Sequence, residues 1–442
     1  MLKTFKIGGI HPAANKLSAT SKIEKLPLPD SITILVSQHI GAPSKVIVNK
    51  GDKVKVGQLV ATSAGFVSAN IHSSVSGTVS KIEMVTDSSG YKKEAIVVNV
   101  EGDEWDESID RSSEIVANFS FDAKYISDKI VSSGIVGLGG ATFPTHVKLT
   151  PPTGTKAEVL IINGAECEPY LTADHRLMIE KGEEILIGTK LLMKTLGVEK
   201  AVIGIENNKP DAIRNITELT KKYTDITVCP LQVKYPQGGE KQLIKAVTGR
   251  EVASGALPIS VGAVVNNVGT TFAVYEAVIK NKPLFERVIT VTGKSFSKPS
   301  NFLVRLGTPV GNLIEAAGGM PNDVAKVVMG GPMMGKSLTS VDIPVSKGTS
   351  GILVIDENEG HRNEIQNCIR CGQCIDACPM GLEPYLLMPL TENKRWSDME
   401  ALHIMDCIEC GSCTYTCPAN RPILDYLRLG KSTVGTIIRN RK

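Results

Sequence analysis

The chain has 442 residues, of which 42% are hydrophobic and only 5% aromatic, and its formal net charge is +3. A length of this size predicts about three domains, on a prior of ~150 residues each. The small charge and the lack of a basic stripe with interleaved aromatic residues argue against a nucleic-acid partner. No run reaches the ~18 apolar residues that a membrane span needs, and residues 1–7 lack the apolar run of a signal peptide.

Residues 1–110 have the pattern of β-structure, since short apolar runs alternate with turn signals. The segments 46–60 and 71–79 resemble the two halves of a biotinyl/lipoyl-type barrel sandwich. Such domains carry their cofactor on a Lys at the hairpin tip between those halves, but the corresponding segment, Ser63–Asn70, contains no Lys. We therefore expect a structural or docking module, in which His72 is packed or solvated and is not a ligand.

After an acidic and polar linker at 101–120, the hydrophobic pattern changes to alternating strands and helices. This alternation over residues 115–285 predicts a Rossmann-like, mostly parallel sheet with flanking helices. One continuous helix is expected over 176–196, ending at Gly197, because glycine is favoured just after a helix C-terminus. The expected strands span residues 159–162, 201–205, 226–233 and 263–265, and the other helices 211–223, 241–247 and 271–280. Residues 286–352 return to a strand pattern, with one helix at about 310–317.

Two copies of one cysteine pattern lie in the C-terminal segment 355–442 and account for eight of the ten cysteines. Each copy has the spacing C-x-x-C-x-x-C-x-x-x-C-P, and four thiolates at this spacing suit a [4Fe–4S] cluster in a reducing compartment. In ferredoxin-like modules of this spacing, the fourth Cys of each motif serves the other cluster. The prediction is therefore one cluster on Cys368, Cys371, Cys374 and Cys417, and one on Cys407, Cys410, Cys413 and Cys378.

A glycine-rich stretch, Gly134–Lys148, lies at the start of the α/β region. Glycines let backbone N–H groups approach an anionic group, and Lys148 can supply a point charge to a phosphate. The stretch lacks the third glycine of the dinucleotide fingerprint, so by itself a simple turn would be the better interpretation. Polar clusters at 163–170, 235–241 and 266–270 follow predicted strands, where open α/β sheets bind ligands.

We expect these four loops to form one polar crevice at the edge of the sheet. Its amides and carboxylates suit a flavin and a nicotinamide nucleotide better than hydrolysis, since no Ser-His-Asp or Cys-His arrangement is recognisable. The two cysteines outside the cluster motifs, Cys167 and Cys229, are expected to pack, because free Cys is among the most buried residue types. Contact with the flavin is the alternative for Cys167.

Segments 137–145, 163–169 and 266–268 resemble the FMN- and NADH-binding loops of the flavoprotein subunit of respiratory complex I. The segment after residue 286 resembles the soluble-ligand-binding β-grasp (SLBB) domain that follows in that family. The order of modules over the whole chain resembles the RnfC family, the C subunits of Rnf ion-translocating oxidoreductase complexes. It implies a barrel sandwich at 1–110, an FMN/NADH-binding α/β domain at 115–285, an SLBB β-grasp domain at 286–352 and an α-helical two-cluster ferredoxin-like domain at 355–442.

The resemblance also implies roles for individual residues. Phe143 would stack on the adenine of NADH, Lys148 matches the Lys of the family loop, and Glu168 and Glu240 would be the catalytic carboxylates beside the nicotinamide. Three features depart from the complex I pattern: Ala165 and Gly239 replace acidic residues, and no second aromatic follows Lys148. The residues that would line FMN are Gly137, Gly139, Gly140, Asn163, Glu166, Gly238, Asn266 and Asn267.

The function implied is hydride exchange between NAD(H) and FMN, followed by one-electron transfer through two [4Fe–4S] clusters. The chain would be a peripheral subunit on the cytoplasmic face of the cell (inner) membrane, an NADH-interacting oxidoreductase partnered by the other Rnf subunits. Two alternatives remain. One is a soluble flavin/iron–sulfur cobalamin reductase, in which the cluster module would precede the β-grasp domain. The other is a non-catalytic adaptor that relays electrons between clusters.

Overall fold

Two small antiparallel sheets form the first domain of the computed structural model, which describes residues 2–441. Apolar side chains of both sheets, such as Ile34 and Val79, are buried between them, which confirms the barrel-sandwich prediction. His72 is packed in this domain, and burial lowers the pKa of its imidazole to about 3. One sheet has the order β2 (Ser31–Leu35), β8 (Lys92–Val100), β7 (Gly77–Thr86), β4 (Lys53–Val54), and the other β3 (Lys45–Val46), β5 (Leu59–Thr62), β6 (Ile71–His72).

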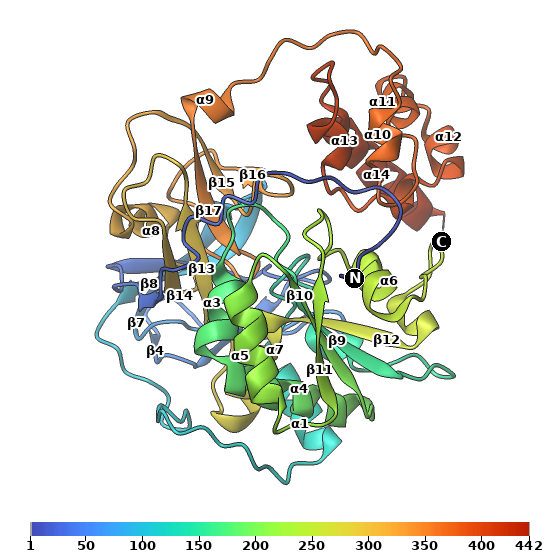
Figure 1. The fold of residues 1–442 in the computed structure, drawn as a ribbon. Coiled ribbons are helices and arrows are strands. Elements are labelled where there is room, and N and C mark those ends of the chain that lie inside the picture. The colour runs from blue at the N-terminus through green and yellow to red at the C-terminus, as the bar shows by residue number, and fades with distance from the viewer. Residues whose placement is uncertain (1, 442) are drawn as a thin grey trace.

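The second domain is built on a four-stranded sheet in which every neighbouring pair is parallel, as the alternating pattern predicts. One face is covered by the short helix α6 (Glu240–Thr248) and the other by a group of helices (Figure 1). The strands have the order β11 (Ile226–Leu231), β10 (Ala201–Glu206), β9 (Val159–Gly164), β12 (Ala263–Asn267). The helices are α1 (Ala123–Ser132), α2 (Thr145–Lys148), α3 (Ala173–Glu180), α4 (Gly182–Leu196), α5 (Pro210–Thr220) and α7 (Val268–Ile279).

The single helix expected over 176–196 is wrong, because the chain breaks between α3 and α4. Lys181 leaves the helical region, with φ −132° and ψ 28°. Gly182 then begins α4 in tight contact with α5, where an added Cβ would lie 2.6 Å from Cδ1 of Leu219. The expected end of the helix at Gly197 is correct, and this glycine has the left-handed φ of +65° that favours the residue.

A six-stranded sheet forms the third domain, with α8 (Val310–Ala316) packed against it. Its edge strand β1 comes from residues 23–25, which the sequence placed in the first domain. A fully buried lysine, Lys347, joins this domain to the first two, because its Nζ donates to the carbonyls of Asn70 at 2.8 Å and Gly134 at 2.7 Å. The strand order is β1 (Ile23–Lys25), β14 (Ser300–Arg305), β13 (Glu286–Thr292), β17 (Gly351–Asp356), β15 (Val324–Met329), β16 (Lys336–Ser337).

The C-terminal domain is helical, and its helices surround the cysteine loops (Figure 1). Its core contains buried apolar side chains such as Leu387, Met399 and Leu427. Within residues 2–441, no helix has the length and apolar character that crossing a membrane requires. The helices are α10 (Gln373–Asp376), α11 (Pro384–Glu392), α12 (Trp396–Ala401), α13 (Ser412–Tyr415) and α14 (Ile423–Asn440), whereas the short helix α9 (Glu357–Gly360) lies before them in the chain and packs against β15 and β17 of the third domain (Figure 1).

The N-terminal segment connects the second domain to the C-terminal helices. Ile10 exchanges two backbone hydrogen bonds with Tyr235, each 2.8 Å, in the loop after β11. The neighbouring Gly9 N–H donates to the carbonyl of Ala377 at 3.0 Å, beside the first cysteine motif. Gly8 has a φ of +64°, and an added Cβ there would lie 2.3 Å from the carbonyl oxygen of Cys378. The segment therefore holds one cysteine motif close to the α/β sheet.

Candidate cofactor sites

The four predicted polar loops meet at the carboxyl ends of β9, β11 and β12. Nδ2 of Asn163, near the end of β9, donates to the carbonyl of Gly238, after β11, at 2.9 Å. Asn267, at the end of β12, caps α7 by accepting from the N–H groups of Gly269 and Thr270. Gly139 approaches this cap so closely that an added Cβ would lie 2.6 Å from Asn267 Nδ2. The four loops thus come together at the switch edge of the parallel sheet, and we refer to the polar region between them as the crevice.

A carboxylate pair borders the crevice. The Glu166 carboxylate accepts from the backbone N–H groups of Asp174 at 2.8 Å and His175 at 3.1 Å, so it caps the N-terminus of α3. The Asp174 carboxylate accepts from Asn267 Nδ2 at 2.6 Å. Burial, and then the charge of Glu166, raise the pKa of the Asp174 carboxyl. Asp174 was not predicted as a site residue from the sequence. An acidic residue in the first turn of a helix indicates only a favourable interaction with the helix dipole.

Lys148 and Glu240 form an ion pair across the mouth of the crevice, with Nζ and Oε1 2.6 Å apart. Lys148 Nζ also donates to the carbonyl of Val265 in β12 at 3.1 Å. Both side chains are partly exposed, at 30% and 39%, so the pair is accessible to a ligand. A bound phosphate would compete with Glu240 for the ammonium group.

Glu168 does not join this pair. Its carboxylate accepts from the backbone N–H groups of Met333 at 3.2 Å and Met334 at 2.8 Å, in the turn between β15 and β16. Burial raises the pKa of this carboxyl to about 7. Glu168 therefore connects the loop after β9 to the third domain, and its expected place beside the nicotinamide stays a prediction.

The remaining predicted residues leave room and hydrogen-bonding capacity for a ligand. An added Cβ on Gly140 would meet nothing within 4 Å, so the glycine loop is open at this point. The loop is closed at its base, where the Gly137 N–H donates to the carbonyl of the half-buried Phe143 at 2.9 Å. Asn266 is buried, and its Nδ2 lacks a hydrogen-bond partner among the described residues. An open glycine loop beside an unpaired buried amide fits a flat ligand with a polar edge and a phosphate, as FMN has.

Two lysines, the half-buried Lys16 and the fully buried Lys209, support the loop after β9. Lys16 Nζ donates to three of its backbone carbonyls, at 2.6, 2.8 and 2.9 Å. Lys209 Nζ donates to the carbonyl of Ala165 at 2.7 Å and lies 3.6 Å from Glu206 Oε2. Burial and then the charge of Lys209 lower the pKa of Lys16 to about 8. The sequence carries no local signal for either contact, because each joins segments far apart in the chain.

The cysteines of the C-terminal domain form two sets. Cys368, Cys371, Cys374 and Cys417 line one cavity of about 300 Å³. The other four, Cys378, Cys407, Cys410 and Cys413, are all buried. Burial raises the pKa values of the Cys407, Cys410 and Cys413 thiols, and the charges of neighbouring cysteines, Cys378 among them, add to the effect. These are the sets that crossed ligation predicts, although the ligation itself stays a prediction.

Within residues 2–441, no three His, Cys, Asp or Glu side chains are gathered closely enough to hold a single metal ion. A cubane differs in this respect, because its four thiolates bind four separate irons at the corners of a cluster. A cavity lined by four spaced cysteines is therefore the arrangement that such a cluster needs. The donor set is all thiolate, which suits iron–sulfur chemistry.

The second cysteine set borders the crevice. The buried Tyr235, in the loop after β11, donates its hydroxyl proton to the carbonyl of Cys410 at 2.8 Å. In the same loop, the Gly238 N–H donates to Cys167 Sγ at 3.3 Å. Cys167 is thus packed between the crevice and the cluster domain, in a group of side chains that includes Tyr235 and Cys410. In the first set, by contrast, Cys368 and Cys371 are exposed.

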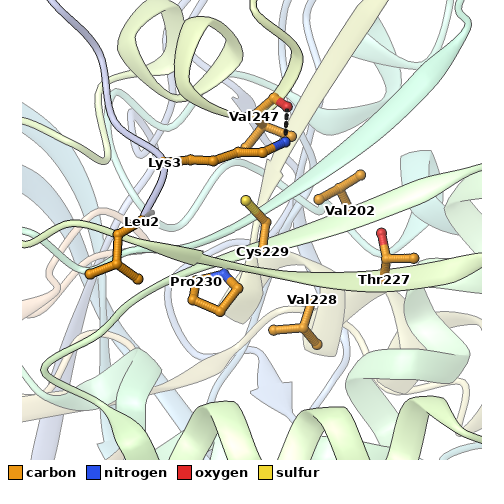
Figure 2. A pocket seen from close by; sticks show the side chains of 8 residues that line it. All are labelled: Leu2, Lys3, Val202, Thr227, Val228, Cys229, Pro230 and Val247. Atoms are coloured by element: carbon orange, nitrogen blue, oxygen red, sulfur yellow. Dashed lines mark hydrogen bonds between the residues drawn. The ribbon is translucent and has the colours of Figure 1, made fainter.

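A separate hollow of about 570 Å³ lies beside the sheet edge at β11 (Figure 2). Its walls include Val202, Cys229 and Val247, and Lys3 bridges it by donating from Nζ to the carbonyl of Val247 at 3.0 Å. Cys229 is buried there, as its predicted packing role requires. None of the residues predicted to bind a cofactor lines this hollow.

Comparisons with known proteins match four family models in the predicted order. They are the RnfC barrel sandwich hybrid domain over residues 3–103, the Nuo51 FMN-binding domain over 130–276, the SLBB domain over 288–337 and the 4Fe-4S dicluster domain over 367–421.

Similar curated proteins include the C subunits of three complexes. That of the proton-translocating ferredoxin:NAD(+) oxidoreductase complex of Clostridium ljungdahlii is 48% identical over 98% of this chain and 94% of its own length. That of the Na(+)-translocating ferredoxin:NAD(+) oxidoreductase complex of Acetobacterium woodii is 45% identical over 98% of this chain and 97% of its own. The C subunit of the ion-translocating oxidoreductase complex of Rhodobacter capsulatus is 41% identical over 87% of this chain and 75% of its own length.

Proposed function

Because the chain belongs to the RnfC family, the C subunits of ion-translocating ferredoxin:NAD oxidoreductase complexes, we propose that it transfers electrons between NAD(H) and two iron–sulfur clusters by way of FMN. It is an oxidoreductase subunit of a membrane complex, and the other Rnf subunits are its partners. We place it on the cytoplasmic face of the inner membrane as a peripheral subunit, where NAD(H) is available.

One observation carries the proposal: the crevice and a four-cysteine set share a wall. Tyr235 belongs to the loop that supplies Gly238 to the crevice, and its hydroxyl is hydrogen-bonded to the carbonyl of Cys410 at 2.8 Å. Gln242, in the first turns of α6, donates from Nε2 to the carbonyl of Pro379 at 3.1 Å, directly after Cys378. A ligand in the crevice would thus lie beside the second cysteine set.

The crevice residues have distinct roles in this proposal. The open glycine loop at 137–140 would receive the FMN phosphate through its backbone N–H groups, and Asn163 and Asn267 would hold the hydroxyls of its chain. Asn266 would donate its unpaired amide to the polar edge of the ring. When bound, FMN supplies the chemistry that the chain lacks, since it takes up two electrons as hydride and gives them up singly.

The nucleotide side of the site would use the ion pair at the mouth of the crevice. Lys148 would exchange Glu240 for a phosphate of NAD(H), and the released Glu240 carboxylate would then face the nucleotide. Phe143 would stack on the adenine base. Glu168 would lie near the nicotinamide on the other side of the loop after β9. Its two hydrogen bonds from backbone N–H groups would there hold the third domain in place.

Anaerobic reconstitution of the full chain with iron, sulfide and FMN, followed by NADH titration, tests the proposal. FMN takes two electrons and each cluster one, so complete bleaching should need about two NADH per chain. The same chain loaded with FMN alone should need about one. Bound FMN with clusters that stay oxidised in NADH would contradict the proposal and favour a cluster relay without catalysis.

A further inference from the structure

The hairpin tip of the barrel-sandwich domain, Ser63–Asn70, lies against the glycine-rich loop of the second domain. The carbonyl oxygen of Phe66 accepts a hydrogen bond from His146 Nε2 at 2.8 Å. The two rings meet edge to face, with centroids 5.7 Å apart and planes at 85°. The connection between β2 and β3 of the same domain also touches the loop, where the Ile40 N–H donates to the carbonyl of Thr142 at 3.4 Å. The loop that begins at the crevice is thus bordered by another domain.

The tip is rigid because side chains satisfy its backbone. The fully buried Ser68 donates from Oγ to the carbonyl of Ala42 at 2.9 Å and accepts from the Ala64 N–H at 3.1 Å. Asn70 Oδ1 accepts from the Ser63 N–H at 2.9 Å, and its Nδ2 donates to the carbonyl of Ser132 in the second domain at 3.1 Å. A tip held in this way presents its outward side chains with little loss of conformational freedom when a ligand binds.

Phe66 is the large apolar side chain that this tip presents to solvent, with 62% of its surface exposed. The neighbouring part of the glycine loop, Gly139–Ala141, is exposed as well, and Gly140 has open space around it. Phe143, the aromatic of that loop, lies three residues before His146, the residue that Phe66 contacts. Directly after Lys148 the chain offers no further aromatic side chain, since Leu149–Pro151 follow. Segments that adjoin the glycine loop in two different domains thus each carry an aromatic side chain, Phe66 in the hairpin tip and Phe143 in the loop itself.

We propose that Phe66 is a base-stacking residue of the nucleotide site, which contacts the adenine of NAD(H) together with Phe143. The proposal rests on the proposed function and assigns the barrel-sandwich domain a part in nucleotide binding. Aromatic rings stack on the flat face of a base without needing hydrogen bonds, and a ring fixed in advance loses little entropy on binding. The hairpin that carries a modified Lys in biotinyl/lipoyl-type domains carries this ring instead.

Calorimetry with ADP-ribose tests this role of Phe66, because the probe contains the adenine but no nicotinamide and cannot exchange hydride. In the full chain loaded with FMN and clusters, Phe66→Ala should weaken ADP-ribose binding about 5- to 100-fold, the range for loss of one base stack. Phe66→Trp should restore binding. The matched control is Tyr91→Ala, which removes a 70% exposed aromatic from the turn between β7 and β8 of the same domain and should leave binding unchanged. FMN content and iron content should be equal in all four proteins.

Equal ADP-ribose affinity in the wild type and Phe66→Ala would overturn the stacking role while leaving the proposed function intact. Equal weakening by Phe66→Ala and Tyr91→Ala would overturn it too, because it would show a general effect on the domain. Failure of the wild type itself to bind either ADP-ribose or NADH would instead refute the proposed function. The two ideas therefore fail in distinguishable ways.

Discussion

Replacing Cys378 with Ala separates crossed from uncrossed ligation of the clusters. Cys378 belongs to the first motif by sequence, but in space it is buried with Cys407, Cys410 and Cys413. Its loss should therefore remove the cluster of the second motif and leave the first. Iron should fall from about eight to about four per chain, since each cubane holds four irons. Complete chemical reduction should take about one electron fewer per chain, because one cluster takes one electron.

Electron paramagnetic resonance of the chemically reduced protein identifies which cluster is lost. Cys378→Ala should give the same spectrum as Cys410→Ala, and Cys417→Ala the same as Cys371→Ala. Cys229→Ala is the matched control, because this buried cysteine lies outside both sets and should leave both signals intact. If Cys378→Ala matched Cys371→Ala instead, the crossing would be wrong, and the grouping of cysteines around the cavity would have to reflect packing alone.

Three further predictions concern buried polar groups. Tyr235→Phe leaves the Cys410 carbonyl without its hydrogen bond, which should cost about 1–3 kcal/mol at the contact between the domains. Stopped-flow measurements should show slower reduction of the clusters and unchanged reduction of the flavin. Equal slowing of both steps would contradict a role of Tyr235 at this contact. Burial lowers the pKa of Lys347 to about 7 from 10.5. Between these pH values the unfolded chain therefore binds one proton more than the folded chain, and the free energy of unfolding should rise by about 1.4 kcal/mol per pH unit. Urea unfolding at pH 8 and pH 9.5 should show this slope, and Lys347→Met should remove it. The pH dependence that Glu168 contributes has the opposite sign. The pKa of this carboxyl is about 7 in the folded chain, above the ordinary 4.5. Its contribution to the free energy of unfolding should therefore be lost as the pH rises from 4.5 to about 7, by about 3 kcal/mol in all. Glu168→Gln should flatten the curve between pH 5 and pH 8, and an unchanged curve would mean that the carboxyl ionises freely.

Much of the site could be predicted because its signals are local. A glycine that must approach a neighbouring backbone or side chain, such as Gly139 against Asn267, is visible as a glycine in the sequence. Polar residues at the ends of strands, such as Asn163 in β9, necessarily lie at the carboxyl edge of a parallel sheet. The contacts that were missed depend on distant segments. The position of Glu168 near the nicotinamide stays a prediction, but its hydrogen bonds from backbone N–H groups of the third domain, some 165 residues away, were not foreseen.

The prediction of one continuous helix over 176–196 was wrong for the same reason, a contact with a distant segment. Its sequence has continuous helical periodicity, and the break at Lys181 becomes visible only when Gly182 is seen in contact with Leu219 of α5. Likewise, residues 23–25 have an ordinary strand pattern, and pairing with β14 decides which sheet they join. Periodicity determines which face of an element is buried, but not which partner buries it.

The eight cysteines of the cluster motifs show which features the sequence determines and which only the tertiary structure decides. Their spacing along the chain is enough to predict two cubane clusters, since three of the four ligands of each cluster come from one short loop. The amino-acid sequence likewise determined the four modules and their order, because changes of hydrophobic period mark the segments and the motifs within them resemble those of known families. Only the tertiary structure decided that the Cys410 motif borders the flavin crevice, that Cys368 and Cys371 face outward, and that Phe66 lies beside the glycine loop. These contacts join surfaces of separately folded domains, and no local pattern encodes how such surfaces meet.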